Sequence, residues 1–87
     1  MKTPQINSIG PSVLEIRARL ATLTPREREV LEYVVAGKSN KQIAGELDAI
    51  EKTVKTHRAH VMEKMGAQSV AELVQLLERC RIDGTVQ

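Results

Sequence analysis

Apolar residues recur at helical spacing in five stretches of the chain, and residues that cap or break helices separate these stretches. The first stretch spans residues 12–21, and its apolar side chains fall on one helical face. Ser12 and Glu15 stand at its start with the spacing of a capping box, in which each side chain accepts from the backbone N–H of the other. The pattern predicts a short helix ahead of the main unit.

The next two stretches begin with the same signal. The segment TPRE at 24–27 supplies an N-cap threonine, a proline at the first helical position and a glutamate at the third. Gly37 ends this helix near residue 36. The segment SNKQ at 39–42 opens a shorter helix with the same reciprocal cap. That short helix is predicted to end around Leu47 or Asp48.

Two further helices complete the predicted fold. A longer helix spans 51–65 and is stopped by Gly66, and the segment SVAE at 69–72 caps the last one. The apolar stripe of this last helix consists of Val70, Leu73, Val74 and Leu77. Nothing in the chain alternates convincingly over the length of a strand, so the predicted fold class is all-α.

These elements divide the chain into four parts. Residues 1–11 contain two prolines and a glycine and are predicted to form a linker or a flexible start. Residues 12–21 form the extra short helix, and 22–82 form one domain of four helices. Residues 83–87 are predicted to fray.

The helix over 51–65 presents two different faces. At about 100° per residue, the core side consists of Val54, Arg58, Val61 and Met65. The opposite face mixes the long cations Lys52 and Lys55 with the short side chains of Thr56 and Ala59. A DNA major groove about 12 Å wide admits a helix whose central side chains are small, while cations at its margins reach phosphates. Such a face is also typical of the solvated side of an ordinary amphipathic helix.

The preceding short helix favours the first interpretation. A helix of about eight residues, a tight connection and a longer basic helix form the helix-turn-helix arrangement, here over about 39–65. The formal net charge of +2 agrees with this location, because residues 38–64 hold six basic and four acidic side chains while the rest of the chain balances at seven each. One tyrosine and no phenylalanine or tryptophan exclude the aromatic platforms that hold single-stranded nucleic acid. A duplex is therefore the expected partner.

Several other classes of protein are excluded. The single cysteine, Cys80, provides neither an internal disulfide nor a cysteine-based zinc site. The longest apolar run, at 33–36, is far shorter than the roughly 20 residues of a membrane helix, so we expect a cytoplasmic protein without a membrane partner. There is no glycine-rich phosphate loop and no nucleophile elbow, which argues against an enzyme. His57 and His60 are too few to bind zinc, so we expect no metal and no cofactor, and a packed, hydrogen-bonded role for His57.

Two runs of the sequence, LTPREREVLEYVVAGKSNKQIAGEL and TVKTHRAHVMEKMGAQSVAELV, resemble the LuxR/FixJ-type helix-turn-helix DNA-binding domain over about residues 23–77. This is the output domain of many bacterial two-component response regulators. The resemblance implies a four-helix domain that binds specific double-stranded DNA to regulate transcription, with the helix over 51–65 in the major groove. It implies base contacts at Lys55, Thr56 and Ala59, and phosphate contacts at Asn40, Lys41, Lys52 and Thr53.

The resemblance also implies a homodimer formed through the last helix. We place its interface at Leu73, Leu76 and Cys80, because Leu76 and Cys80 widen the apolar stripe of that helix beyond what a small core requires. Two interpretations of this width remain open: it packs against residues 12–20 of the same chain, or it joins two copies. A receiver domain, removed from this chain or encoded elsewhere, and RNA polymerase are further candidate partners. The competing function is a helical protein-interaction module that binds no DNA.

The sequence departs from the resemblance at two positions. Related domains usually have an apolar residue and then serine or threonine before the third helix, whereas this chain has Ala49 and Ile50. Loss of a capping hydroxyl costs about 1 kcal/mol, and it either loosens the start of the helix or shifts that start to Asp48. Several related domains have a basic residue at the position of Ala59, so a methyl contact is the expected role of this alanine.

Overall fold

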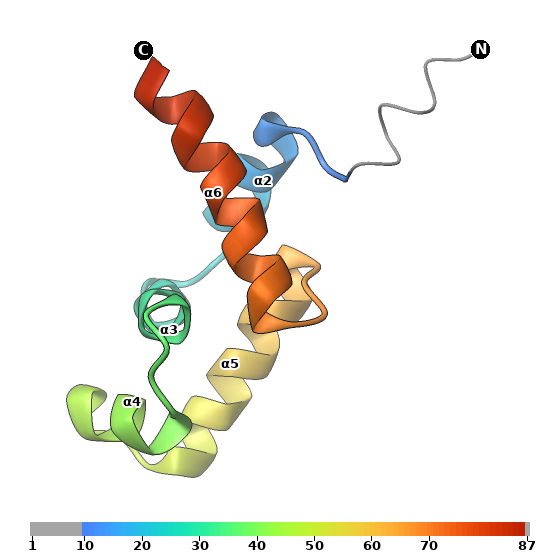
Figure 1. Cartoon of the computed structure of the whole chain (residues 1–87). Helices are drawn as coiled ribbons and strands as arrows, with labels where there is room; N and C mark the ends of the chain where they lie inside the picture. Colours follow the sequence, from blue (N-terminus) through green and yellow to red (C-terminus); the bar gives the residue numbers. More distant parts are fainter. Residues whose placement is uncertain (1–9, 87) are drawn as a thin grey trace.

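The structure is a computed structural model and describes residues 10–86, which form five helices and no strand (Figure 1). The helices are α2 (Val13–Ala21), α3 (Pro25–Val35), α4 (Asn40–Leu47), α5 (Glu51–Met65) and α6 (Val70–Val86). The predicted all-α fold is confirmed, including the extra short helix before the main unit. Most of the predicted linker at 1–11 lies outside the described residues.

The helix starts follow the predicted capping boxes. In α2, α3 and α4 the N-cap hydroxyl accepts from the third backbone N–H, and the third side chain accepts from the N-cap N–H. The pairs are Ser12 with Glu15, Thr24 with Glu27, and Ser39 with Gln42. Each box satisfies two of the backbone donors that a helix N-terminus leaves without intrahelical partners, so local sequence alone fixes these starts.

The connection between α4 and α5 shows where α5 starts in the absence of a serine or threonine N-cap. Asp48 ends α4 in the left-handed conformation, with φ 54°, which short polar side chains tolerate better than most. Asp48 therefore does not start α5. Ile50 is the N-cap of α5 and makes no side-chain capping bond, so α5 begins at Glu51 as predicted but without a capping hydroxyl.

Helix α6 is longer than predicted. It starts after Ser69, whose Oγ accepts from the backbone N–H of Glu72 over 3.1 Å, while the Glu72 carboxylate accepts from the backbone N–H of Gln68 rather than that of Ser69. The helix continues to Val86, past the predicted end of the domain at residue 82, and fraying of the chain after residue 83 stays a prediction. No proline follows Pro25, so every later residue keeps the N–H that a helix needs.

All five helices contribute to one core. Helix α5 packs against α2, α3 and α4, while α6 packs against α2 and α3. The largest fully buried side chains of this core are Ile16, Ile43, Met65, Leu73, Val30, Val34, Val54 and Val61. None of the helices described is long and apolar enough to cross a membrane. In Figure 1, α4 and the start of α5 lie at one end of the molecule, and the later turns of α6 lie at the other.

The apolar residues of α6 that were predicted to form a dimer interface are largely buried within the single chain. Leu73 and Leu76 are only 0% and 7% exposed within the single chain, and Cys80 is half-buried. Leu73 and Leu76 belong to the buried core and Cys80 packs against it, and α6 packs against both α2 and α3. Packing between α2 and α6 agrees with the interpretation in which the wide apolar stripe contacts residues 12–20 of the same chain. Leu73 and Leu76 are thus almost wholly covered within one chain, and the dimer interface predicted at Leu73, Leu76 and Cys80 stays a prediction.

Candidate nucleic-acid interface

Helices α4 and α5 form the predicted helix-turn-helix. Three residues, 48–50, connect α4 to α5, and the two helices pack directly against each other. Val54, Val61 and Met65 of α5 are fully buried against the rest of the domain. This packing orients α5 and determines which of its side chains face outward.

The opposite side of α5 is exposed. All five residues predicted there to contact DNA lie on the surface: Lys52, Thr53, Lys55, Thr56 and Ala59. The hydroxyl of Thr56 donates to the backbone carbonyl of Lys52 over 3.2 Å, one turn earlier in the same helix. Because that proton is used within the helix, Thr56 offers its methyl group and an acceptor oxygen to a ligand. Together with the methyl group of Ala59, it leaves a centre of small side chains on this face.

A groove joins α4 to this face. Asn40 of α4 lines it together with Glu51, Lys52 and Lys55 of α5. Lys41, the remaining predicted phosphate contact, is exposed at the next position of α4. The α4 N-terminus contributes the positive end of the helix dipole to the same region. Two helices thus bring cationic and donor groups together, with one carboxylate, Glu51, among them.

Arg58 makes a contact that the sequence analysis missed. Its place on the core side of the predicted helix suggested packing, but the side chain is half-buried and its Nη1 donates to Oδ1 of Asn40 over 3.2 Å. An arginine within an otherwise apolar stripe was the signal available in the sequence. Since α4 and α5 meet at this bond, Arg58 connects a predicted phosphate-binding residue to the helix predicted to enter the groove.

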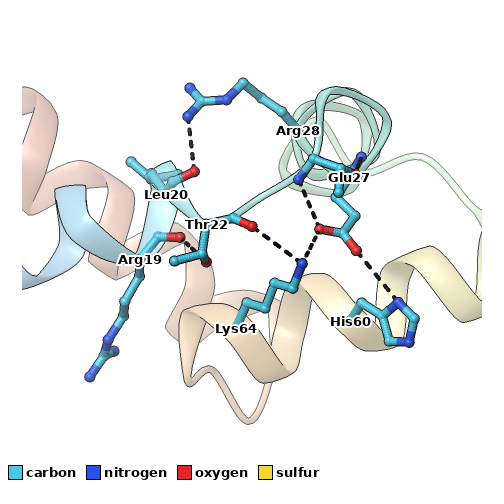
Figure 2. Close-up of polar contacts among 8 residues, drawn as sticks. Arg19, Leu20, Thr22, Glu27, Arg28, His60 and Lys64 are labelled. Atoms are coloured by element: carbon cyan, nitrogen blue, oxygen red, sulfur yellow. Dashed lines mark hydrogen bonds and ion pairs between the residues drawn. The ribbon is translucent and has the colours of Figure 1, made fainter.

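A second missed contact fixes α5 against α3. Glu27, predicted only as a capping residue, is 4% exposed, and its Oε1 accepts from Lys64 Nζ over 2.7 Å as well as from the backbone N–H of Thr24. His60 Nδ1 lies 3.5 Å from Oε2 of the same carboxylate. Lys64 also donates to the backbone carbonyl of Thr22 over 3.2 Å. Figure 2 shows Glu27 between Lys64 and His60, so one carboxylate connects the start of α3 to two successive turns of α5.

The surroundings of Glu27 favour its ionised form. The hydrogen bond from Lys64 and then the one from the Thr24 backbone lower the pKa of the carboxyl from 4.5 to about 2, although burial acts in the opposite direction. The positive charge of Lys64 and the proximity of His60 act in the same direction as these hydrogen bonds and contribute to the same lowered pKa. Glu27 is therefore a carboxylate at neutral pH, and its ion pair with Lys64 helps to set the orientation of α5.

The two histidines have separate environments. His60 is paired with Glu27, whereas Nδ1 of His57 is buried without a hydrogen-bond partner. The prediction of a packed His57 is confirmed, but the predicted hydrogen bond is not made at Nδ1. Within the part of the chain that the structure describes, no three histidine, cysteine, aspartate or glutamate side chains are grouped in a way that suits a metal ion.

Comparison with known proteins shows to which family the chain belongs. The model of the bacterial regulatory proteins of the luxR family matches residues 21–77. The chain belongs to the luxR family. This match covers α3, α4 and α5 and the first half of α6, and the chain is a DNA-binding domain of a transcription regulator.

Individual relatives agree with this assignment. The chain is 52% identical over 65 residues to transcriptional regulatory protein FixJ of Bradyrhizobium diazoefficiens, an alignment that covers 75% of this chain and 32% of FixJ. It is 44% identical over 78 residues to response regulator protein TmoT of Ectopseudomonas mendocina, covering 90% and 36% of the two chains. This luxR-family chain therefore spans about a third of the length of these relatives.

Solved structures share the fold. Full-length FixJ from B. japonicum matches with a TM-score of 0.73 and 48% identity, over 80% of this chain and 34% of that one. The response regulator StyR matches with the same TM-score and 45% identity, over 75% and 33%. The predicted four-helix fold and the predicted membership of this family are both confirmed.

Proposed function

We propose that this luxR-family domain binds a specific DNA duplex by inserting α5 into the major groove. The observation that supports this most is the exposed face of α5, where small side chains lie between cations on a helix held rigidly from behind. In this arrangement Lys55 donates to guanine O6 and N7, while Thr56 and Ala59 meet thymine methyl groups.

Phosphate contacts fix the orientation of the helix on the duplex. Lys52 and Thr53 at the start of α5 and Asn40 and Lys41 at the start of α4 contact the backbone on either side of the groove. The support is their location: Asn40 and Lys52 line the same groove, and the other two are exposed. The side-chain charges and the α4 dipole both favour a phosphate group.

The domain acts as the output part of a response regulator. TmoT is named a response regulator protein, StyR is a response regulator, and the chain matches about a third of each. A receiver domain that accepts a phosphoryl group accordingly belongs to the complete regulator, with RNA polymerase as a further partner. A duplex DNA partner also places the protein in the cytoplasm.

Two domains bind together as a homodimer through α6. Of the three residues predicted to form the interface, Cys80 is the most exposed within one chain, and Val74 and Leu77 on the same helix are half-buried as well. A dimer of this kind places two copies of α5 about one helical turn of DNA apart, roughly 34 Å.

Selection of bound sequences from a random duplex library tests the proposal. Paired half-sites about ten base pairs apart are expected, with an affinity for the selected duplex that falls steeply with salt concentration. If no sequence is enriched and no salt-sensitive binding is found, the domain is instead a protein-interaction module. Enrichment of single half-sites contradicts only the homodimer and leaves specific DNA binding supported.

A further inference from the structure

The hydrogen bond between Arg58 and Asn40 fixes the orientation of an amide group. Arg58 Nη1 lies 3.2 Å from Oδ1 of Asn40, the first residue of α4, and both side chains are half-buried. A guanidinium group has N–H donors and no acceptor. The amide oxygen must therefore face Arg58, and the two N–H donors on Nδ2 of Asn40 are directed away from it.

This orientation suits a phosphate. Asn40 borders the groove that Lys52 and Lys55 also line, at the N-terminus of α4. An amide turned the other way would present its oxygen to the negative phosphate, which has no proton to donate. The bond from Arg58 removes this second orientation and leaves donors available at the surface.

We propose that Arg58 is a positioning residue for DNA binding: it holds Asn40 so that Nδ2 donates to a backbone phosphate, and it does not contact the DNA itself. This proposal rests on the phosphate contact of Asn40 given above. Because Arg58 belongs to α5, the donor on α4 is coupled to the helix that enters the groove.

A double-mutant cycle separates positioning from direct contact. Arg58→Met keeps much of the side-chain length and removes every donor, while Asn40→Ala removes the proposed phosphate contact. Affinity for the selected duplex is measured for the parent chain, both single variants and the double variant, over a series of salt concentrations. Arg17→Met removes the same charge from an exposed position of α2 and serves as the control.

We expect Asn40→Ala to weaken binding roughly tenfold, as for loss of a hydrogen bond to a charged group, and Arg58→Met by no more than this. In the Asn40→Ala background, Arg58→Met has no further effect beyond that of Arg17→Met. The salt dependence of Arg58→Met matches that of Arg17→Met, because a neutral amide contact releases no counterion.

Asn40→Asp distinguishes this role from a structural one. The carboxylate has nearly the same shape and accepts more strongly from Arg58, so the melting temperature is unchanged or raised. It has no donor and places a negative charge beside the phosphate, so affinity falls below that of Asn40→Ala. A purely structural bond between α4 and α5 predicts instead that the uncharged variant Asn40→Ala loses affinity only as far as it loses melting temperature.

Two outcomes overturn different parts of the proposal. Unchanged affinity in Asn40→Ala removes the phosphate contact itself, and the positioning role with it. The other outcome is that Asn40→Ala lowers the affinity and that Arg58→Met lowers it equally in the parent chain and in the Asn40→Ala variant. The phosphate contact of Asn40 is then supported, and only the positioning role of Arg58 is overturned.

Discussion

Lys52 and Lys55 have the same side chain one turn apart on α5, yet their positions give them different expected roles. Lys55→Ala should reduce discrimination between the selected duplex and a random one, since it removes a contact to base edges worth about 1–3 kcal/mol. Lys52→Ala should weaken both duplexes alike and lower the salt slope by about one unit. Titrations of each variant on both duplexes give the comparison. Equal losses on both duplexes for Lys55→Ala would contradict its contact with a base.

Glu27 makes the free energy of unfolding of the domain depend on pH in the acidic range. Its pKa is lowered from 4.5 to about 2 in the folded chain, so the unfolded chain binds more protons between these two values. The stabilisation is complete above pH 4.5 and is lost as the pH falls toward 2. The shift corresponds to about 3 kcal/mol as an order of magnitude. Chemical denaturation from pH 2 to 7 measures this loss.

Glu27→Gln tests the same carboxylate. Glutamine still accepts from the backbone N–H of Thr24 but carries no charge for Lys64, so the free energy of unfolding at pH 7 should fall by about 1–3 kcal/mol and lose much of its dependence on pH below 5. Glu29→Gln is the matched control, because Glu29 pairs with Arg26 on the exposed side of α3 and should change stability by less than about 1 kcal/mol. Equal effects of the two variants would show that the buried pair adds nothing.

At the scale of single helices, α5 lacks one stabilising device that α2, α3 and α4 possess. Ile50 occupies its N-cap with 65% of its surface exposed and no capping bond. Ile50→Ser should therefore raise the free energy of unfolding by about 0.5–1 kcal/mol, and Ile50→Ala should not. Thermal melting of both variants provides the test. A serine variant no more stable than the alanine variant would mean that the start of α5 is already satisfied.

The same helices show why some features followed from the sequence and others did not. Caps and stops act within about four residues, so TPRE at 24–27 and SNKQ at 39–42 were sufficient to locate the starts of α3 and α4. The exposed face of α5 followed from its period alone. The bond from Arg58 to Asn40 spans 18 positions and that from Lys64 to Glu27 spans 37, so they depend on how the helices pack. Periodicity contains no such information.

At the scale of the whole molecule, α2 connects the start of the described chain to the two helices that matter most for function. Ile16 is fully buried, and Arg19 Nη1 donates to the backbone carbonyl of Met65 over 2.8 Å, at the last residue of α5. Helix α2 also packs against α6. A displacement of α2 would therefore act on both the end of the groove-binding helix and the proposed dimer helix.

A substitution at Leu76 tests whether α2 packs against α6 in solution. A carboxylate introduced by Leu76→Glu would enter a site that is 7% exposed, so the variant should lose at least about 2 kcal/mol of stability and melt at a lower temperature. Leu14→Glu on the outer side of α2, where the parent leucine is 78% exposed, should melt like the parent. Sedimentation of the same variants reports their self-association. Normal melting of Leu76→Glu with loss of the dimer would contradict the burial of Leu76 within one chain, and would support its predicted place at the interface between two copies.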